Sequence, residues 1–203
     1  MFLDYLKLKF NNYYIVDDIF PESLCERLRQ HSLSNKSGAI LAHSGDYSAT
    51  NFDMTEENDP ELKKASEIIC SKVSLAHESR YLRSWYFVYD TISRGVVPHV
   101  DPGALTVNVW VTPEHCIEDR EKNGMRLYRD SRQKMNWSYY YNSSAEVQTY
   151  LTDKYLKGVK YDKIPYRYNR AIIFGGKTFH STDYVHTKHG HENKRVNYAF
   201  LYD

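Results

Sequence analysis

The sequence predicts an α+β fold that is mainly β, with helices near the N-terminus and a sandwich of short strands after them. Two helical patterns lie before residue 77, and most of the later patterns are strand-like. The 19 tyrosines and an aromatic content of 15% favour β-sheet over a helical bundle. Because 203 residues suffice for one full core but hardly for two, we expect a single domain over residues 1–203.

The N-terminal part is expected to contain one strand and two helices. Residues 11–20 have the apolar content of a strand, and Pro21 suits the first turn of a helix over residues 21–33. Residues 34–58 are rich in Ser, Gly, Asn and Asp, which indicates loops and short edges. A second helix is expected over residues 60–76, where apolar residues recur at helical steps.

The strand-like runs of the rest of the chain end at prolines or turn-forming residues. They are residues 83–92, 96–102, 104–113, 125–129, 170–176 and 195–202. In the third run, Thr106, Asn108 and Trp110 alternate with Leu and Val residues. One face of this strand is therefore polar enough to line a pocket.

A long insertion is expected at about residues 114–163. Its start is charge-rich, and the remainder is polar and rich in tyrosine, with one possible helix over residues 145–156. Long insertions on a compact sheet domain are often lids or binding loops. The aromatic stretch from Trp137 to Tyr155 is therefore expected to border a substrate entrance.

The charge balance argues against some classes of partner. With 27 basic and 26 acidic residues, the chain has no overall field to hold a polyanion or an anionic bilayer, so neither nucleic acid nor a membrane is expected. No apolar run approaches the ~20 residues of a membrane span. The three cysteines match no disulfide or metal spacing, which favours a reducing compartment, and we expect a cytoplasmic protein.

His99 and Asp101 carry the strongest chemical signal. In an extended chain, side chains two positions apart project to the same side, so both can bind one metal ion while Val100 points away. A third ligand, His180, would complete a face of two histidines and one carboxylate. Such a face leaves other coordination positions open, as non-haem Fe(II) oxygenases require.

Other titratable residues that follow His180 are expected to lie outside the site. His186, His189 and His191 stand in a polar loop, where solvent exposure is the simpler interpretation than a second metal site. Asp183 is expected to orient a neighbour or to cap the loop, and not to be a ligand.

The order of the motifs resembles that of the 2-oxoglutarate and Fe(II)-dependent oxygenases, in particular of prolyl-hydroxylase-like members. The resemblance covers most of the chain and rests on the segments YYIVDDIFPESLCERLRQ, YDTISRGVVPHVDPG, LTVNVWVTP with the following Gly124, NRAIIFGGKTFHSTD and RVNYAFLYD. It implies a double-stranded β-helix (jelly-roll, cupin-like) core with flanking N-terminal helices. It also implies Fe(II) held by His99, Asp101 and His180, with 2-oxoglutarate and O2 as cosubstrates.

Arg195 is the residue that the resemblance assigns to the far carboxylate of 2-oxoglutarate. Its planar, always charged fork suits bidentate capture of a carboxylate. It follows His180 by 15 positions, more than is usual in the family, so Lys188 and Lys194 remain alternatives. Strand alternation places Arg195 and Asn197 on one face and Lys194 on the other.

Two further residues are expected to contact the cosubstrate. Tyr89 resembles the strand tyrosine that hydrogen-bonds the cosubstrate in related enzymes, with Trp85 and Tyr86 as alternatives. Asn108 lies on the polar face of the adjacent strand-like run.

The resemblance implies a dioxygenase that decarboxylates 2-oxoglutarate to succinate and hydroxylates a C–H bond of a peptidyl, amino-acid-like or other small substrate. Asp101 argues against halogenation, because related halogenases lack this carboxylate, and the last strand lacks the second arginine of the nucleic-acid repair dioxygenases. Two alternatives remain. One is a non-catalytic, cupin-like binding or structural module, and the other is a jelly-roll enzyme with another metal, which would not need Arg195.

Overall fold

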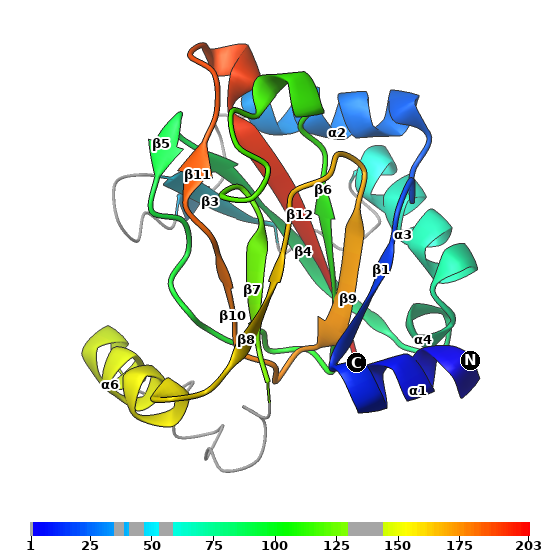
Figure 1. Ribbon diagram of the computed structural model, residues 1–203. Coiled ribbons are helices and arrows are strands. Elements are labelled where there is room, and N and C mark those ends of the chain that lie inside the picture. The colour runs from blue at the N-terminus through cyan, green and yellow to red at the C-terminus, as the bar shows by residue number, and fades with distance from the viewer. Residues whose placement is uncertain (1, 35–38, 41–46, 53–58, 130–143) are drawn as a thin grey trace.

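The computed structural model is built mainly from antiparallel strands (Figure 1). It describes residues 2–34, 39–40, 47–52, 59–129 and 144–203. The strands are β1 Tyr13–Val16, β2 Ala39–Ile40, β3 Tyr47–Phe52, β4 Tyr81–Tyr89, β5 Ile92–Ser93, β6 Leu105–Trp110, β7 Met125–Tyr128, β8 Tyr161–Ile164, β9 Ala171–Gly175, β10 His180–Thr182, β11 Val185–His186 and β12 Arg195–Tyr202. The helices are α1 Phe2–Asn11, α2 Glu22–Ser34, α3 Pro60–Lys72, α4 Ser74–His77 and α6 Ala145–Leu156, with short 3-10 helices at Glu114–Cys116 and His191–Asn193.

Two sheets face each other across the site described below. The large sheet has seven strands in the order β1-β9-β6-β12-β4-β3-β2, and the small sheet has three in the order β10-β7-β8. A separate pair joins β11 to β5. All pairings are antiparallel, and β12 lies in the middle of the large sheet between β6 and β4. The predicted α+β, mainly β class is confirmed.

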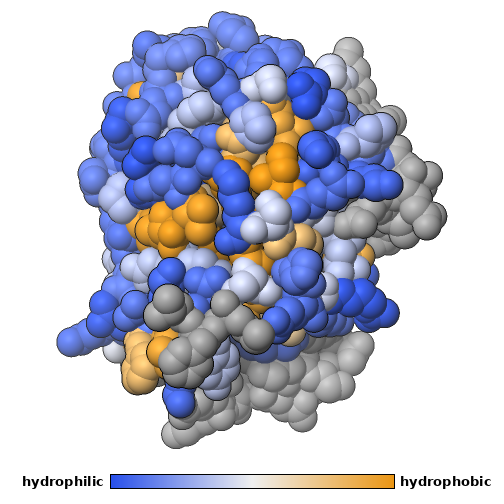
Figure 2. Space-filling view, turned by 90° about the vertical axis from the view of Figure 1, so that its right-hand side faces the viewer, coloured by the Kyte–Doolittle hydropathy of each residue, from blue (hydrophilic) through white to orange (hydrophobic). Residues whose placement is uncertain are grey.

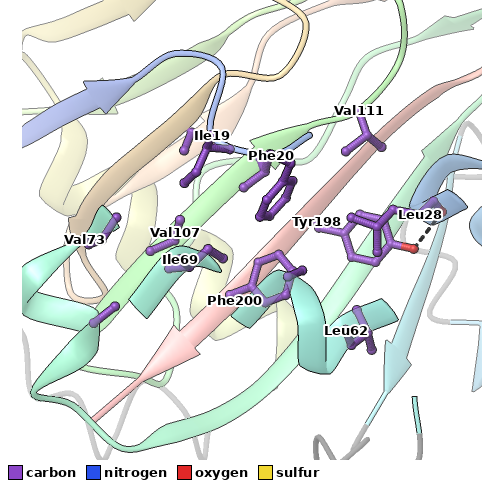
Figure 3. Close-up of a cluster of buried hydrophobic side chains, with 14 of the residues drawn as sticks. Ile19, Phe20, Leu28, Leu62, Ile69, Val73, Val107, Val111, Tyr198 and Phe200 are labelled. Carbon is purple, nitrogen blue, oxygen red and sulfur yellow. Dashed lines mark hydrogen bonds between the residues drawn. The ribbon is translucent and has the colours of Figure 1, made fainter. Parts of the chain in front are cut away.

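One face of the large sheet forms the main hydrophobic core beneath α2 and α3. Every second residue of β12 points into it, namely Val196, Tyr198, Phe200 and Tyr202, and β6 adds Val107 and Val109. Figure 3 shows Val107, Tyr198 and Phe200 of the sheet close to Leu28, Leu62 and Ile69 of the helices. Since fully burying one large apolar side chain contributes about 1.5–3 kcal/mol, this face anchors the helices on the sheet.

The helix α3 has clear start and stop signals. The side chain of Asp59 accepts hydrogen bonds from the backbone N–H groups of Glu61 and Leu62, and Pro60 occupies the first turn. Helical geometry ends at Val73, which is extended, and the chain then forms the short α4. The single helix predicted over 60–76 is therefore two helices.

Two other N-terminal features differ from the sequence prediction. Residues Phe2–Asn11 form the helix α1, whose periodicity the charged residues in this stretch obscured. Within the range expected as loops and short edges, β3 pairs along β4 from Tyr47 to Phe52. This strand has few β-branched residues, so its sheet position comes from pairing with β4 and not from propensity.

The range 114–163, expected as an insertion, contributes both β7 and β8 of the small sheet. The possible helix over 145–156 is present as α6. Leu151 and Tyr155 of this helix pack against Val100 and Phe179. Tyr155 is not among the residues that line the hollow described below, and Trp137 lies outside the described residues.

The surface on the helical side is mostly hydrophilic. Figure 2 views the side that lies at the right of Figure 1 and shows apolar patches near its middle, surrounded by polar residues. None of the described helices is both long and apolar enough to cross a membrane.

A hydrogen-bonded tyrosine fastens α2 to the central strand. The hydroxyl of buried Tyr198 donates to the carbonyl of Leu28 at 2.9 Å and lies 2.6 Å from the hydroxyl of Ser32 (Figure 3). We expect Tyr198→Phe to lower the free energy of unfolding by about 1–2 kcal/mol, because a buried hydrogen-bonding pair is broken. Urea denaturation measures this change. Tyr184→Phe, at an exposed position, should change stability by less than about 0.5 kcal/mol, and equal effects of the two variants would contradict the role of Tyr198.

Candidate active site

His99 and His180 lie directly opposite each other in an isolated antiparallel bridge. Each backbone N–H donates to the carbonyl of the other residue, at 3.0 and 2.9 Å. Residues paired in this way project their side chains to the same face at close range. The two imidazole rings accordingly have centroids 4.3 Å apart.

Asp101 reaches the same place because the chain after His99 stays extended. Its backbone N–H donates to the carbonyl of Gly176, which follows β9. A Cβ atom at Gly176 would lie 2.0 Å from the carbonyl oxygen of Gly103. Only glycine therefore permits this close approach of the two segments.

The three side chains together form a candidate metal site. The ligand atoms of His99, Asp101 and His180 all lie within 4.8 Å of one another, and this is the only such group among the described residues. The Nε2 atom of His99 is 3.8 Å from Asp101 Oδ1, and that of His180 is 3.5 Å from Asp101 Oδ2. The structure thus brings together the ligands that the sequence predicted.

Backbone carbonyls orient both histidine rings. His99 Nδ1 lies 2.8 Å from the carbonyl oxygen of Val97, and His180 Nδ1 lies 3.0 Å from that of Thr178. Each carbonyl accepts the Nδ1 proton, so each Nε2 presents its lone pair to the space between the ligands. Burial, with the neighbouring His180, lowers the pKa of His99 to about 4, so this ring is neutral and able to ligate a metal at neutral pH.

Thr106 on β6 holds the carboxylate. Its hydroxyl donates to Asp101 Oδ2 at 2.8 Å, and both side chains are buried. A hydrogen bond to one carboxylate oxygen fixes the orientation of the group.

A hollow opens between the two sheets beside the three ligands. Its lining comes from both sheets and consists of Trp85, Phe87, Tyr89, Val96, His99, Asp101, Asn108, Met125, His180, Thr182, Asn197 and Ala199. Besides the candidate ligands, these residues carry no charged side chain. Asn108 and Asn197 are therefore on the polar face that strand alternation predicted, and Tyr89 lines the same hollow.

Arg195 lies next to this lining without being part of it. It is 1% exposed, and its Nη1 donates to Asn197 Oδ1 at 3.2 Å. Three aromatic rings surround its guanidinium carbon, with centroids at 4.7 Å for Tyr89, 5.6 Å for Trp110 and 5.7 Å for Tyr166. Such cation–π contacts stabilise a cation that has little access to water.

The charge of Arg195 has no anionic partner within the described part of the chain. Its hydrogen-bond acceptor is the neutral amide of Asn197, and its Nε atom has no partner there. Burial raises the pKa of Tyr89 and of Tyr166, so both phenols stay neutral. A buried cation without a counter-ion is costly, and a bound anion would relieve that cost.

The two alternative cations are placed differently. Lys194 Nζ pairs with Asp90 at 2.7 Å, and Lys188 is exposed. Of the alternatives to Tyr89, Tyr86 points into the hydrophobic core, whereas Trp85 lines the hollow. Tyr89 is the one that contacts Arg195, and its hydroxyl is 2.9 Å from that of Thr182.

Asp183 fastens the strand that carries His180. Its buried carboxylate pairs with Arg126 of β7 at 2.6 Å and with Lys163 of β8 at 3.0 Å, so it links all three strands of the small sheet. Asp183 is thus an orienting residue, as predicted. His186, His189 and His191 take no part in the candidate metal site.

Several residues of the site were not identified from the sequence. Thr106 and Trp110 stood on the predicted polar face, but nothing local indicated that one would bond Asp101 and the other would lie beside Arg195. Tyr166 follows β8 in a segment without a strand pattern. The carbonyls that orient the histidines belong to residues two positions before each ligand, which only the backbone course reveals.

No family model and no curated protein sequence matches the chain. Solved structures do match, with low identity. SnoN, a non-heme α-ketoglutarate-dependent epimerase from nogalamycin biosynthesis, is 11% identical with a TM-score of 0.70, over 98% of this chain and 81% of SnoN. HygX from Streptomyces hygroscopicus, solved with nickel and 2-oxoglutarate bound, is 9% identical with a TM-score of 0.64, over 100% of this chain and 86% of HygX.

A prolyl hydroxylase from Trichoplax adhaerens, solved with a peptide fragment of hypoxia inducible factor, is 14% identical with a TM-score of 0.57, over 98% of this chain and 86% of the hydroxylase. At such identities the likeness shows a shared fold. The chain therefore has the jelly-roll fold of 2-oxoglutarate-dependent enzymes, which confirms the fold prediction.

The hydrogen bond from Thr106 to Asp101 generates a testable prediction. We expect Thr106→Val to weaken the binding of Ni(II) or Co(II) about tenfold or more, because the carboxylate loses its orienting donor. Thr178→Val is the matched control, since it removes a buried hydroxyl that has no partner among the described residues and keeps the backbone carbonyl that orients His180. Calorimetric titration of both variants measures the difference. Equal affinity of Thr106→Val and wild type would show that Thr106 only fills space.

Proposed function

We propose that the chain forms one oxygenase domain that uses Fe(II), 2-oxoglutarate and O2. The observation that carries this proposal is the buried cation of Arg195, which has no acidic partner among the described residues and lies beside a hollow lined by His99, Asp101 and His180. A metal site alone fits many enzymes. A metal site with a nearby buried anion site fits a cosubstrate that is both a chelator and a carboxylate.

The donor set fits Fe(II). Two imidazoles and one carboxylate on one side of an ion would leave its remaining positions open, which is the arrangement of non-haem Fe(II) oxygenases. When bound there, iron would supply the redox chemistry that couples reduction of O2 and decarboxylation of 2-oxoglutarate, to succinate and CO2, with oxidation of a substrate C–H bond. The carbonyls of Val97 and Thr178 and the hydroxyl of Thr106 keep the ligand atoms directed at the ion.

Arg195 fits the far carboxylate of 2-oxoglutarate. Its guanidinium is buried and flanked by neutral aromatic rings, and Asn197 holds one of its nitrogens. Lys194 is engaged with Asp90, and Lys188 is exposed, so neither offers a comparable site. The binding of 2-oxoglutarate or nickel by HygX is consistent with this use of the fold.

Hydroxylation of a peptidyl, amino-acid-like or other small substrate is the reaction we propose. The similar structures include an epimerase, a carbocyclase and a hydroxylase, with nogalamycin, hygromycin B or a peptide as ligands. Asp101 supports hydroxylation over halogenation, because it occupies the position that a halide would need.

The motifs around His99 and His180 support a place in the prolyl-hydroxylase-like branch, and the balanced charge supports a cytoplasmic protein that binds no nucleic acid. The TM-score is 0.57 with the prolyl hydroxylase and 0.70 with SnoN, so the proposal of this branch rests on the sequence motifs and not on structural similarity.

The first experiment tests the metal ligands and turnover together. Anaerobically iron-loaded protein is mixed with 2-oxoglutarate and then with O2, and succinate is measured. We expect iron-dependent succinate in the wild type and neither iron retention nor succinate in Asp101→Ala, because a carboxylate ligand is lost. Asp90→Ala serves as a control, since Asp90 pairs with Lys194 away from the ligands. Unchanged iron content in Asp101→Ala would refute the ligand assignment, and a wild type that binds no 2-oxoglutarate would favour a non-catalytic module.

The role of Arg195 is tested separately. We expect Arg195→Ala to bind metal as the wild type does but to bind 2-oxoglutarate at least ~100-fold more weakly, because the charged hydrogen bonds to the far carboxylate are lost. Titration of the metal-loaded variant with 2-oxoglutarate measures this. An unchanged affinity would favour a jelly-roll enzyme that uses a metal without 2-oxoglutarate.

A further inference from the structure

Trp110 has an unexplained feature for a core residue. It is 0% exposed, and its indole Nε1 has no hydrogen-bond partner among the described residues. A buried donor without an acceptor costs about 1–3 kcal/mol, so each such group calls for an explanation. Tryptophan can fill space in a core, but phenylalanine would do so without this cost.

The unpartnered indole lies beside a second unpartnered donor. The guanidinium carbon of Arg195 is 5.6 Å from the ring centroid of Trp110, and Arg195 Nε is also buried without a partner. Backbone pairing fixes this proximity, since Trp110 is opposite Asn197 in the register of β6 and β12. Two side chains that each carry a buried, unpartnered N–H donor therefore lie next to each other, and no acidic side chain among the described residues pairs with them.

Trp110 is held firmly in this position. Its ring stacks on that of Tyr166 with centroids 5.0 Å apart and planes at 21°, and the hydroxyl of Tyr166 donates to the carbonyl of Thr112. The backbone N–H of Trp110 donates to the carbonyl of Arg170. An indole fixed on both its face and its backbone presents its N–H in one direction and loses little entropy when it binds a ligand.

The polar face of β6 connects the two ends of the site. Thr106 bonds the metal-ligand carboxylate, Asn108 lines the hollow with a buried and unpartnered Oδ1, and Trp110 lies beside Arg195. A molecule that reaches from the metal ligands to Arg195 would thus run along this face. A dicarboxylate would present its far carboxylate at the level of Trp110, and four lone-pair directions of a carboxylate can accept from several donors.

We propose that the indole N–H of Trp110 donates a hydrogen bond to the far carboxylate of the 2-oxo acid, beside Arg195, so that Trp110 selects a dicarboxylate. This inference rests on the proposed use of 2-oxoglutarate and adds a binding residue to it. The far carboxylate would then be bound by the charged guanidinium of Arg195 and by the neutral indole N–H of Trp110, whose direction is fixed. Both are satisfied only when a second carboxylate is present, and a monocarboxylic 2-oxo acid leaves both unpaired.

The test compares two ligands on Trp110→Phe, which keeps an aromatic ring and removes the N–H. The anaerobic, Fe(II)-loaded protein is titrated calorimetrically with 2-oxoglutarate and with 2-oxobutyrate, which lacks the far carboxylate. We expect the Kd for 2-oxoglutarate to rise about tenfold or more, as for loss of a hydrogen bond to a charged group, and the Kd for 2-oxobutyrate to change less than about twofold. Trp85→Phe is the matched control, because Trp85 lines the same hollow but is not one of the described rings that surround Arg195, and it should leave the ratio of the two Kd values unchanged.

A second measurement follows the ligand response in the wild-type protein itself. In Zn(II)-loaded, 15N-labelled protein, one of the three indole N–H resonances should move downfield and exchange more slowly on addition of 2-oxoglutarate, and not of 2-oxobutyrate. The resonance is assigned to Trp110 by its absence from the spectrum of Trp110→Phe. If that variant does not fold, the resonance is assigned by its persistence in the spectrum of Trp85→Phe, together with the slow solvent exchange of a buried indole N–H.

The outcomes separate the two proposals. If the wild type binds neither 2-oxo acid, the proposed function fails, and the role of Trp110 fails with it. If the wild type binds 2-oxoglutarate but Trp110→Phe weakens both ligands equally or neither, or the Trp110 indole does not respond, only the role of Trp110 is overturned. A selective loss of 2-oxoglutarate affinity supports both.

Discussion

The two-sided burial of β12 is the constraint on which the rest of the structure depends. All eight of its residues are buried, so neither face meets solvent, and the strand alternation decides which chemistry each face receives. Val196, Tyr198 and Phe200 fill the core beneath the helices. Arg195 and Asn197 must then face the small sheet. A slip of one residue in the register would place a guanidinium in the hydrophobic core, so the hydrophobic pattern and the buried charge of Arg195 enforce the same register.

The buried charge of Arg195 follows from this constraint and shapes its surroundings. A guanidinium at a fully enclosed strand position must be stabilised by groups that themselves fit a sheet interior, and the structure uses the rings of Tyr89, Trp110 and Tyr166. Aromatic faces stabilise a cation without neutralising it. An acidic side chain in the same place would form an internal ion pair and close the site to an external carboxylate. The choice of rings in place of acids therefore keeps the positive charge available.

The sequence predicted those parts of the fold and site that local patterns encode. Alternation in β6 and β12 assigned the faces correctly, and the spacing of His99 and Asp101 placed both side chains together, because these relations span only a few residues. The bond from Thr106 to Asp101, the indole of Trp110 beside Arg195 and the ion pairs of Asp183 depend on strand register and on contacts between distant segments. Val73 shows the same limit in a helix: its neighbours have helical periodicity, but Val73 is extended and is buried in the core that the helices share with the large sheet.

The two candidate histidine ligands and the candidate anion site belong to different sheets. His180 belongs to β10 of the small sheet, and the backbone of His99 is hydrogen-bonded to that of His180. Arg195, Tyr89 and Trp110 belong to the large sheet. A ligand held at both ends bridges the two layers, so its binding depends on how firmly the small sheet is located. Two outer contacts locate it: Asp183 joins its three strands through Arg126 and Lys163, and α6 packs behind Val100 and Phe179. Because a displacement of about 1 Å can cost a site much of its activity, these contacts outside the hollow are part of what positions the chemistry within it.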